Sequence, residues 1–186
     1  MLPATAGVIM VSRVHRYALS AVGRDRPGIV AGVTGALLEH GVNIEDSQMA
    51  VLGGHFAMML VLGAPDSADA QALRDRLGAV AAQLDLASLV LEELEAETVA
   101  SPEATHVVSV YGIDHPGIVH SVTSALAEQG ASITDLRTQL AGSSDSPLYA
   151  MLIEVAGPAP DAERLGALAA EQGVELSVSE LERDVL

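Results

Sequence analysis

Hydrophobic and polar positions change their period along this chain in a fixed order. Residues 15–22 alternate between apolar and polar side chains, which predicts a β-strand. A stripe at helical spacing follows, formed by Ile29, Val33, Ala36 and Leu37. Pro27 is predicted to occupy the first helical position, where its missing N–H is no loss. Gly41 is predicted to end this helix, because glycine adopts the left-handed backbone of a helix C-terminus without strain.

The same reasoning predicts the remaining elements of both halves. In the first half these are two strands, a helix and a closing strand: 42–52, 55–62, a helix carrying Leu73, Leu77, Val80 and Ala81, and 86–94. The second half repeats the order at 107–111, 117–129, 131–140, 149–155, 161–172 and 174–181.

The two halves share residues at equivalent positions, so the chain contains an internal repeat. Asp25, Pro27, Gly28, Gly41 and Ile44 recur 89 positions later as Asp114, Pro116, Gly117, Gly130 and Ile133. At the third strand the offset is 93, so four residues are gained within 141–147. We interpret this Gly/Ser/Asp/Pro-rich segment as a lengthened hairpin loop.

The order of elements predicts an α+β chain with two ferredoxin-like βαββαβ domains in tandem. Each domain is expected to carry its helices on one face of an antiparallel sheet. The predicted boundaries are a tail at 1–13, domains at 14–94 and 105–186, and a linker at 95–104. Strand 55–62 is apolar on both faces, so we expect the bare sheet faces or edges to be covered by the other copy or by a second chain.

Composition and charge exclude several classes of function. The 186 residues include no cysteine and no lysine, which removes thiol nucleophiles, cysteine metal clusters and lysine Schiff bases. A net charge of −16 and 2% aromatic residues argue against direct nucleic-acid binding. No apolar run is long enough to span a membrane. We expect no cofactor, and no metal site either, because His115 and His120 do not share a helical face.

The candidate chemistry lies in a repeated strand-to-helix turn, GRDRPGIV at 23–30 and GIDHPGIV at 112–119. The amide groups at the start of a helix are unpaired within it and face an anion favourably. Arg24 and Arg26 flank the first turn, and the Asn43 amide is a candidate for holding the carboxylate or ammonium group of an amino acid. In the alternative interpretation the turn is purely structural and Asp25 caps the helix.

The candidate ligand-binding residues are Arg24, Asp25, Arg26, Gly28, Ile29, Asn43 and Ile44 in the first copy, and Asp114, His115, Gly117, Ile118, Ser132 and Ile133 in the second. The second copy has lost both arginines and the asparagine. We therefore expect the first copy to bind an anionic group more tightly. The aspartate pairs Asp25/Asp46 and Asp114/Asp135 suggest acid–base catalysis, but no nucleophile–base set accompanies them, so enzymatic activity is not expected.

These residues resemble the ACT domain, on the strength of DRPGIV opening a helix and GVNI (41–44) opening the next strand. Two such domains and nothing else most resemble the glycine cleavage system transcriptional repressor family. That resemblance implies a cytoplasmic regulator that senses an amino acid, glycine in particular, and acts through a partner DNA-binding protein. We also expect the chain to form a homo-oligomer. Two alternatives stay open: a regulatory subunit of a metabolic enzyme, and an assembly module without ligand.

Overall fold

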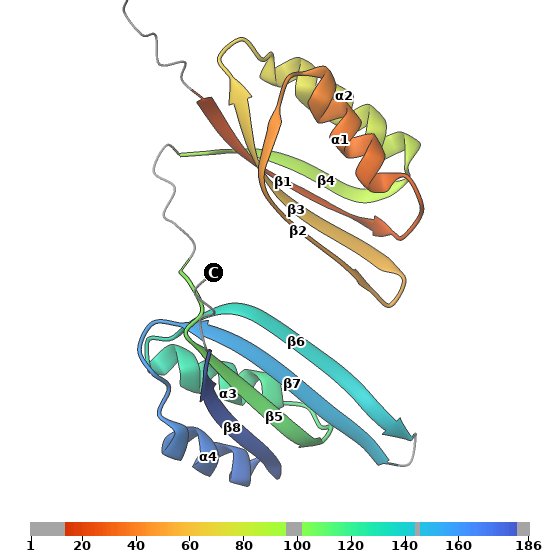
Figure 1. The fold of residues 1–186 in the computed structure, drawn as a ribbon. Coiled ribbons are helices and arrows are strands. Elements are labelled where there is room, and N and C mark those ends of the chain that lie inside the picture. The colour runs from red at the N-terminus through yellow and green to blue at the C-terminus, as the bar shows by residue number, and fades with distance from the viewer. Residues whose placement is uncertain (1–13, 96–101, 144–145, 182–186) are drawn as a thin grey trace, which may run out of the picture. The chain divides into compact units, whose positions relative to one another are not determined.

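The computed structural model describes residues 14–95, 102–143 and 146–181, and the chain divides into two compact units between residues 99 and 100 (Figure 1). The first unit contains β1 (Val14–Arg24), α1 (Ile29–Glu39), β2 (Asn43–Leu52), β3 (His55–Pro65), α2 (Ala70–Gln83) and β4 (Leu86–Leu94). The second contains β5 (His106–Ile113), α3 (Ile118–Glu128), β6 (Ser132–Ser143), β7 (Ser146–Ala156), α4 (Ala162–Glu171) and β8 (Val174–Glu180). The division falls inside the segment predicted as the linker.

Each unit is a four-stranded antiparallel sheet with two helices on one face (Figure 1). The strand orders are β2-β3-β1-β4 and β6-β7-β5-β8, so β2 and β6 are edge strands. This confirms the prediction of two βαββαβ domains in tandem. In both sheets the first strand of the unit pairs with the third and the fourth. The C-terminal ends of β1 and β5 are therefore flanked by a strand on either side.

The predicted helix stripe is confirmed, whereas the predicted helix start is wrong. Ile29, Val33, Ala36 and Leu37 are the buried residues of α1. The helix begins at Ile29 with Gly28 as its N-cap, so Pro27 precedes the cap and does not occupy the first helical position. At the other end the Val42 amide donates to the Leu37 carbonyl at 3.0 Å, which is the closure expected after a left-handed Gly41.

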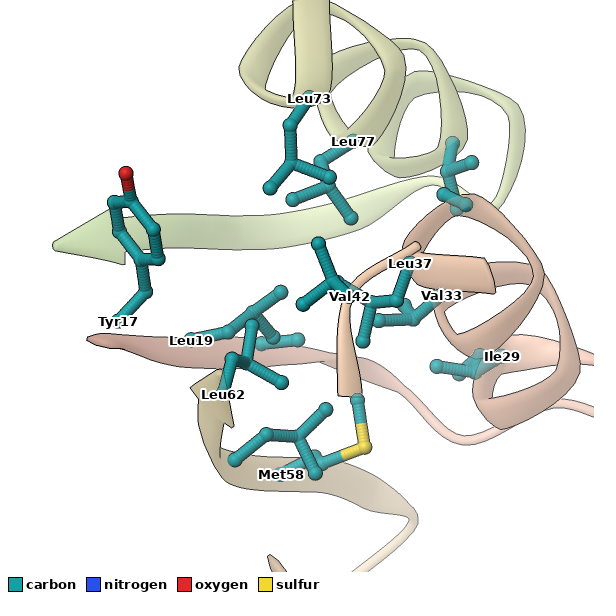
Figure 2. Packing of buried hydrophobic residues seen from close by; sticks show 14 of the residues in the cluster. Tyr17, Leu19, Ile29, Val33, Leu37, Val42, Met58, Leu62, Leu73 and Leu77 are labelled. Carbon is teal, nitrogen blue, oxygen red and sulfur yellow. The ribbon is translucent and has the colours of Figure 1, made fainter. Parts of the chain in front are cut away.

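The core of the first unit lies between the sheet and its helices (Figure 2). Leu19 and Leu62 project from the two central strands, and α1 contributes Val33 and Leu37. Leu77 of α2 completes the layer. In the described part of the chain every fully buried side chain of both cores is hydrophobic, so burial of apolar surface is the main source of stability.

The four residues gained in the second unit lengthen the hairpin strands and do not form a longer loop. In the first unit the last pair of the β2–β3 ladder is Leu52 with His55, around Gly53-Gly54. In the second unit the ladder continues to Ser143 with Ser146, again with two residues between the strands. A hairpin that keeps its two-residue connection can absorb an even insertion by adding pairs, because each pair uses one residue from either strand.

The opposite face of each sheet carries exposed apolar side chains. Met59 is 57% exposed on β3, between buried neighbours on the core side. On the second sheet Tyr111 and Ile113 of β5 and Leu148 and Leu152 of β7 are all exposed by 46% or more, and the register places Ile113 opposite Leu148. Patches of this kind commonly mark interaction surfaces. Coverage of these faces by another copy or chain stays a prediction.

Two neighbouring leucines of α1 test the packing directly. Leu37 is 1% exposed and Leu38 is 79% exposed. We expect Leu37→Ala to lower the free energy of unfolding by about 2–5 kcal/mol, because it removes buried methyl groups and leaves a cavity. Leu38→Ala makes the same chemical change at the next residue of the helix. It should shift the free energy of unfolding by no more than about 0.5 kcal/mol. Urea titration measures both, and equal losses would show that α1 packs by another face.

Candidate functional site

The first candidate site is the turn between β1 and α1. β1 ends at Arg24, and the Asp25 amide donates to the Gly54 carbonyl at 3.0 Å, which fastens the turn to the β2–β3 hairpin. Gly28 then reverses the chain with φ 95°, and its counterpart Gly117 has φ 111°. Residues with a Cβ rarely adopt this left-handed backbone, so glycine is required for the strand to pass directly into the helix.

The helices that follow these turns start without a side-chain cap, unlike the other two helices of the described chain. No side chain caps Gly28 or Gly117. At α2 the Asp69 carboxylate accepts from the amides of Gln71 and Ala72, and Asp161 does the same at α4. The predicted alternative, in which Asp25 caps α1, is therefore wrong. The first-turn amides of α1 and α3 are left for a ligand or for water, and the helix dipole favours an anion there.

A cleft of about 490 Å³ opens beside the first turn. Its lining runs along the chain from Asp25 to Ala31 and is completed by Met49 of β2 and Phe56 of β3. Four of the candidate ligand-binding residues, Asp25, Arg26, Gly28 and Ile29, thus line one cleft. Arg24, the last residue of β1, is exposed but lies outside the cleft lining.

Both turns are tied to the end of the second helix of their unit, by different chemistry. In the first unit Arg26 Nη2 lies 3.1 Å from Asp85 Oδ2, just after the C-terminus of α2. In the second unit the ring of His115, which replaces Arg26, lies 2.7 Å from the backbone carbonyl of Gln172, the C-cap of α4. Partial negative charge gathers at a helix C-terminus, so a cation is stabilised there.

His115 is arranged to be protonated. Nε2 contacts the Gln172 carbonyl, and Nδ1 contacts the Pro116 carbonyl at 3.1 Å. Carbonyl oxygens only accept hydrogen bonds, and both ring nitrogens carry a proton only in the charged imidazolium. The hydrogen bond to Gln172, with the one to Pro116 and the nearby Asp114 carboxylate, raises the pKa of His115 above its ordinary value. Burial and the same Asp114 charge raise the pKa of Tyr149.

The structure does not bring Asn43 and Ile44 to the turn of their own unit. Asn43 pairs with Gly63, which pairs with Arg16, whereas the turn follows Arg24 at the other end of β1. Eight residues of strand separate the two ends, roughly 26 Å. Ser132 and Ile133 lie at the far end of the second sheet in the same way, because Ser132 pairs with Ala156 and Ile113 with Leu148.

The aspartate pairs that suggested acid–base catalysis are not assembled. Asp46 pairs with Val61 in the middle of the sheet, while Asp25 sits at the turn beyond His55. Asp135 forms an ion pair with Arg137 at 2.8 Å. Within the described ranges no group of three His, Asp or Glu side chains is arranged to hold a metal ion. No helix of the described residues is long and apolar enough to cross a membrane.

Sequence reasoning missed the far wall of the cleft and the two ties. Met49 and Phe56 reach the turn only through the hairpin register, in which Val51 faces Phe56 and Met49 faces Met58. The two-residue Gly53-Gly54 turn is the signal that fixes this register. Asp85 has a positive φ of 52° in the structure, where it pairs with Arg26. No local sequence pattern reveals this pairing.

A protein-family model described as the ACT domain matches residues 15–90 and again 104–179. These two matches span most of the chain and coincide with the two units. The chain belongs to the ACT domain family.

Individual relatives of this tandem ACT chain include a transcriptional regulator. It is 31% identical over 131 residues to the glycine cleavage system transcriptional repressor of Escherichia coli, covering 69% of this chain and 68% of the repressor. It is 26% identical over 168 residues to a phosphoserine phosphatase of Mycobacterium tuberculosis, of which it covers only 40%. The crystal structure of an unknown protein from Galdieria sulphuraria superposes with a TM-score of 0.75 at 29% identity, covering 91% of this chain and all of that one. The chain is therefore a glycine cleavage repressor-like ACT regulatory protein.

The two contacts of His115 predict a pH-dependent contribution to stability. Because the pKa of His115 is raised in the folded state, its contribution is complete below the unfolded pKa of about 6.5 and is lost as pH rises through the folded value. The difference in unfolding free energy between the native chain and His115→Gln should therefore shrink above pH ~6.5. His120→Gln is the control, since that ring contacts the Ser124 hydroxyl in place of a backbone carbonyl. Thermal melts across pH measure both variants, and a difference that grew with pH would contradict the assignment.

Proposed function

We propose that this ACT protein is a non-enzymatic amino-acid sensor that acts through a protein partner and does not bind DNA itself. The observation that carries the proposal is the uncapped start of α1 beside an open cleft. A carboxylate is the group that such amides receive best, and Arg26 adds positive charge at the same place. We propose a cytoplasmic location for the same regulator.

The second turn carries the same uncapped amides, but its positive charge is weaker. Arg24 and Arg26 have become Ile113 and His115, and the His115 ring is turned toward two backbone carbonyls. We therefore keep the second turn, with Asp114, Gly117 and Ile118, as a weaker site. This supports the expectation that the first unit binds an anionic ligand more tightly.

A second copy of the chain gives Asn43 and Ile44 a place in the site. β2 is an edge strand whose ten residues are all exposed. If two β2 edges pair antiparallel, the start of one strand lies against the end of the other. Asn43 of one copy then approaches the turn of its neighbour, and Ser132 of β6 does the same in a β6 pair. We propose a homodimer on this ground, and a monomer in light scattering at working concentration would contradict it.

The partner distinguishes two versions of this regulator. The Escherichia coli relative is a transcriptional repressor, which favours a DNA-binding protein as partner. The phosphatase match favours a metabolic enzyme, because in that protein the matched region is joined to further chain. Net charge of −16 supports a protein partner in either case over nucleic acid. Affinity capture from the native cell, with and without amino acid, should recover a DNA-binding protein reproducibly; recovery of an enzyme instead selects the second version.

The pair Gly28→Asp and Gly28→Asn tests the turn as the ligand site. Both substitutions place a side chain of similar size on the left-handed backbone, so their cost in stability should match, on the order of 1–2 kcal/mol. Only the aspartate repels a carboxylate. In thermal melts with each common amino acid, we expect the native chain to be stabilised by its ligand, with ~2.7 kcal/mol at 100 times Kd. Gly28→Asp should lose most of that gain and Gly28→Asn should keep part of it.

Two results would contradict the proposal. Flat melting curves of the native chain with every amino acid would favour an assembly module without ligand. A response of both variants as large as that of the native chain would place the ligand away from the first turn. Gly117→Asp, made in the same way in the second unit, shows how much of the response belongs to the weaker site.

A further inference from the structure

The walls of the first cleft carry information about the ligand beyond its carboxylate. Apart from Asp25 and Arg26, the side chains that line the cleft are apolar. They are Pro27 in the turn, Ile29, Val30 and Ala31 at the start of α1, Met49 of β2 and Phe56 of β3. The two charged residues are adjacent along the turn. The cleft thus has a charged end at the turn and an apolar remainder.

Met49 is available to a ligand, although it lies on the core side of the sheet. Its β3 partner Met58 is 6% exposed, whereas Met49 is 53% exposed. Val30 is 41% exposed on the opposite wall. Apolar side chains held half-open around a cleft gain free energy when a ligand covers them, because apolar surface then leaves water.

We propose that the first unit selects an α-amino acid with an aliphatic or thioether side chain over glycine. This inference rests on the proposed function and names the ligand class of the same site. The carboxylate lies at the free amides of α1 and Arg26, the ammonium group lies near Asp25, and the side chain covers the exposed parts of Met49 and Val30. Glycine satisfies the charged end but leaves the apolar walls in water. A volume of about 490 Å³ is that of an ordinary small-molecule site and far exceeds the need of glycine.

The second unit has different residues at the corresponding positions. Thr138 pairs with Met151 as Met49 pairs with Met58, so a polar side chain replaces the thioether. Tyr149 replaces Phe56 and places its hydroxyl 3.6 Å from the Met151 sulfur. On the helix His120 replaces Ala31. The selectivity for apolar side chains therefore belongs to the first unit alone.

Isothermal titration of the full-length protein with glycine, alanine, leucine and methionine tests the proposal, with Gly117→Asp introduced throughout to weaken the second turn. Each buried methylene adds roughly fourfold to affinity, so leucine or methionine should bind at least about tenfold more tightly than glycine. Met49→Thr, which copies the second unit, should reduce the affinity for leucine and leave that for glycine unchanged. Thr138→Met is the matched control and should alter neither affinity at the first turn.

The outcomes separate this inference from the proposed function. Glycine binding as tightly as leucine overturns the selectivity and leaves the sensor in place. A preference for leucine that survives Met49→Thr also overturns it, because the side chain then lies elsewhere. Absence of binding by all four amino acids overturns the selectivity, whereas the sensor itself is overturned only when no common amino acid raises the melting temperature of the native chain. Circular dichroism and melting of Met49→Thr confirm that a loss of affinity is not a loss of fold, as expected for a half-exposed edge-strand residue.

Discussion

The site depends on one backbone constraint, the left-handed conformation of Gly28 and Gly117. A strand that enters a helix through such a glycine has no residue with a side chain in the capping position. Helices α2 and α4 instead have an extended aspartate in the capping position, and its carboxylate caps the first turn. The same glycine that makes the turn tight therefore leaves the amides of α1 and α3 open, so the fold and the binding capacity have one origin.

The strand order of the sheet determines where the open amides of α1 lie. Because β1 pairs with both β3 and β4, its end lies inside the sheet, and the turn emerges beside the β2–β3 hairpin. The Asp25 amide holds the hairpin there through the Gly54 carbonyl. Edge strand β2 forms one wall of the cleft. It pairs with β3 on its inner side, and no strand of its own unit pairs with its outer edge. A ligand site bounded by an open edge is suited to respond to another chain as well as to a small molecule.

Local periodicity predicted most of the fold, and failed where distance along the sheet mattered. The stripes of α1 and α2 and the apolar central strands follow from periods of 3.6 and 2, which a single sequence displays. Asn43 was assigned to the turn because it follows the helix closely in sequence. The eleven-residue α1 instead carries the chain about 16 Å back along the sheet, so its end and the start of β2 lie far from Gly28. The wall residue Met49 depends on strand register, which no local pattern near Gly28 reveals.

The two copies have kept the geometry of the turn and changed what controls it. The residue after the C-cap of the second helix is left-handed in both units, and the second unit has Gly173 there. The first unit has Asp85 instead, at φ 52°, a conformation that costs a residue with a Cβ some strain. That side chain forms an ion pair with Arg26, a contact that a glycine in the same place has no side chain to make. With glycine in that place, His115 must use the Gln172 carbonyl, and the tie of the second unit depends on a proton. Duplication has thus given one chain two turns of the same shape, one held by fixed charge and one by a titratable group.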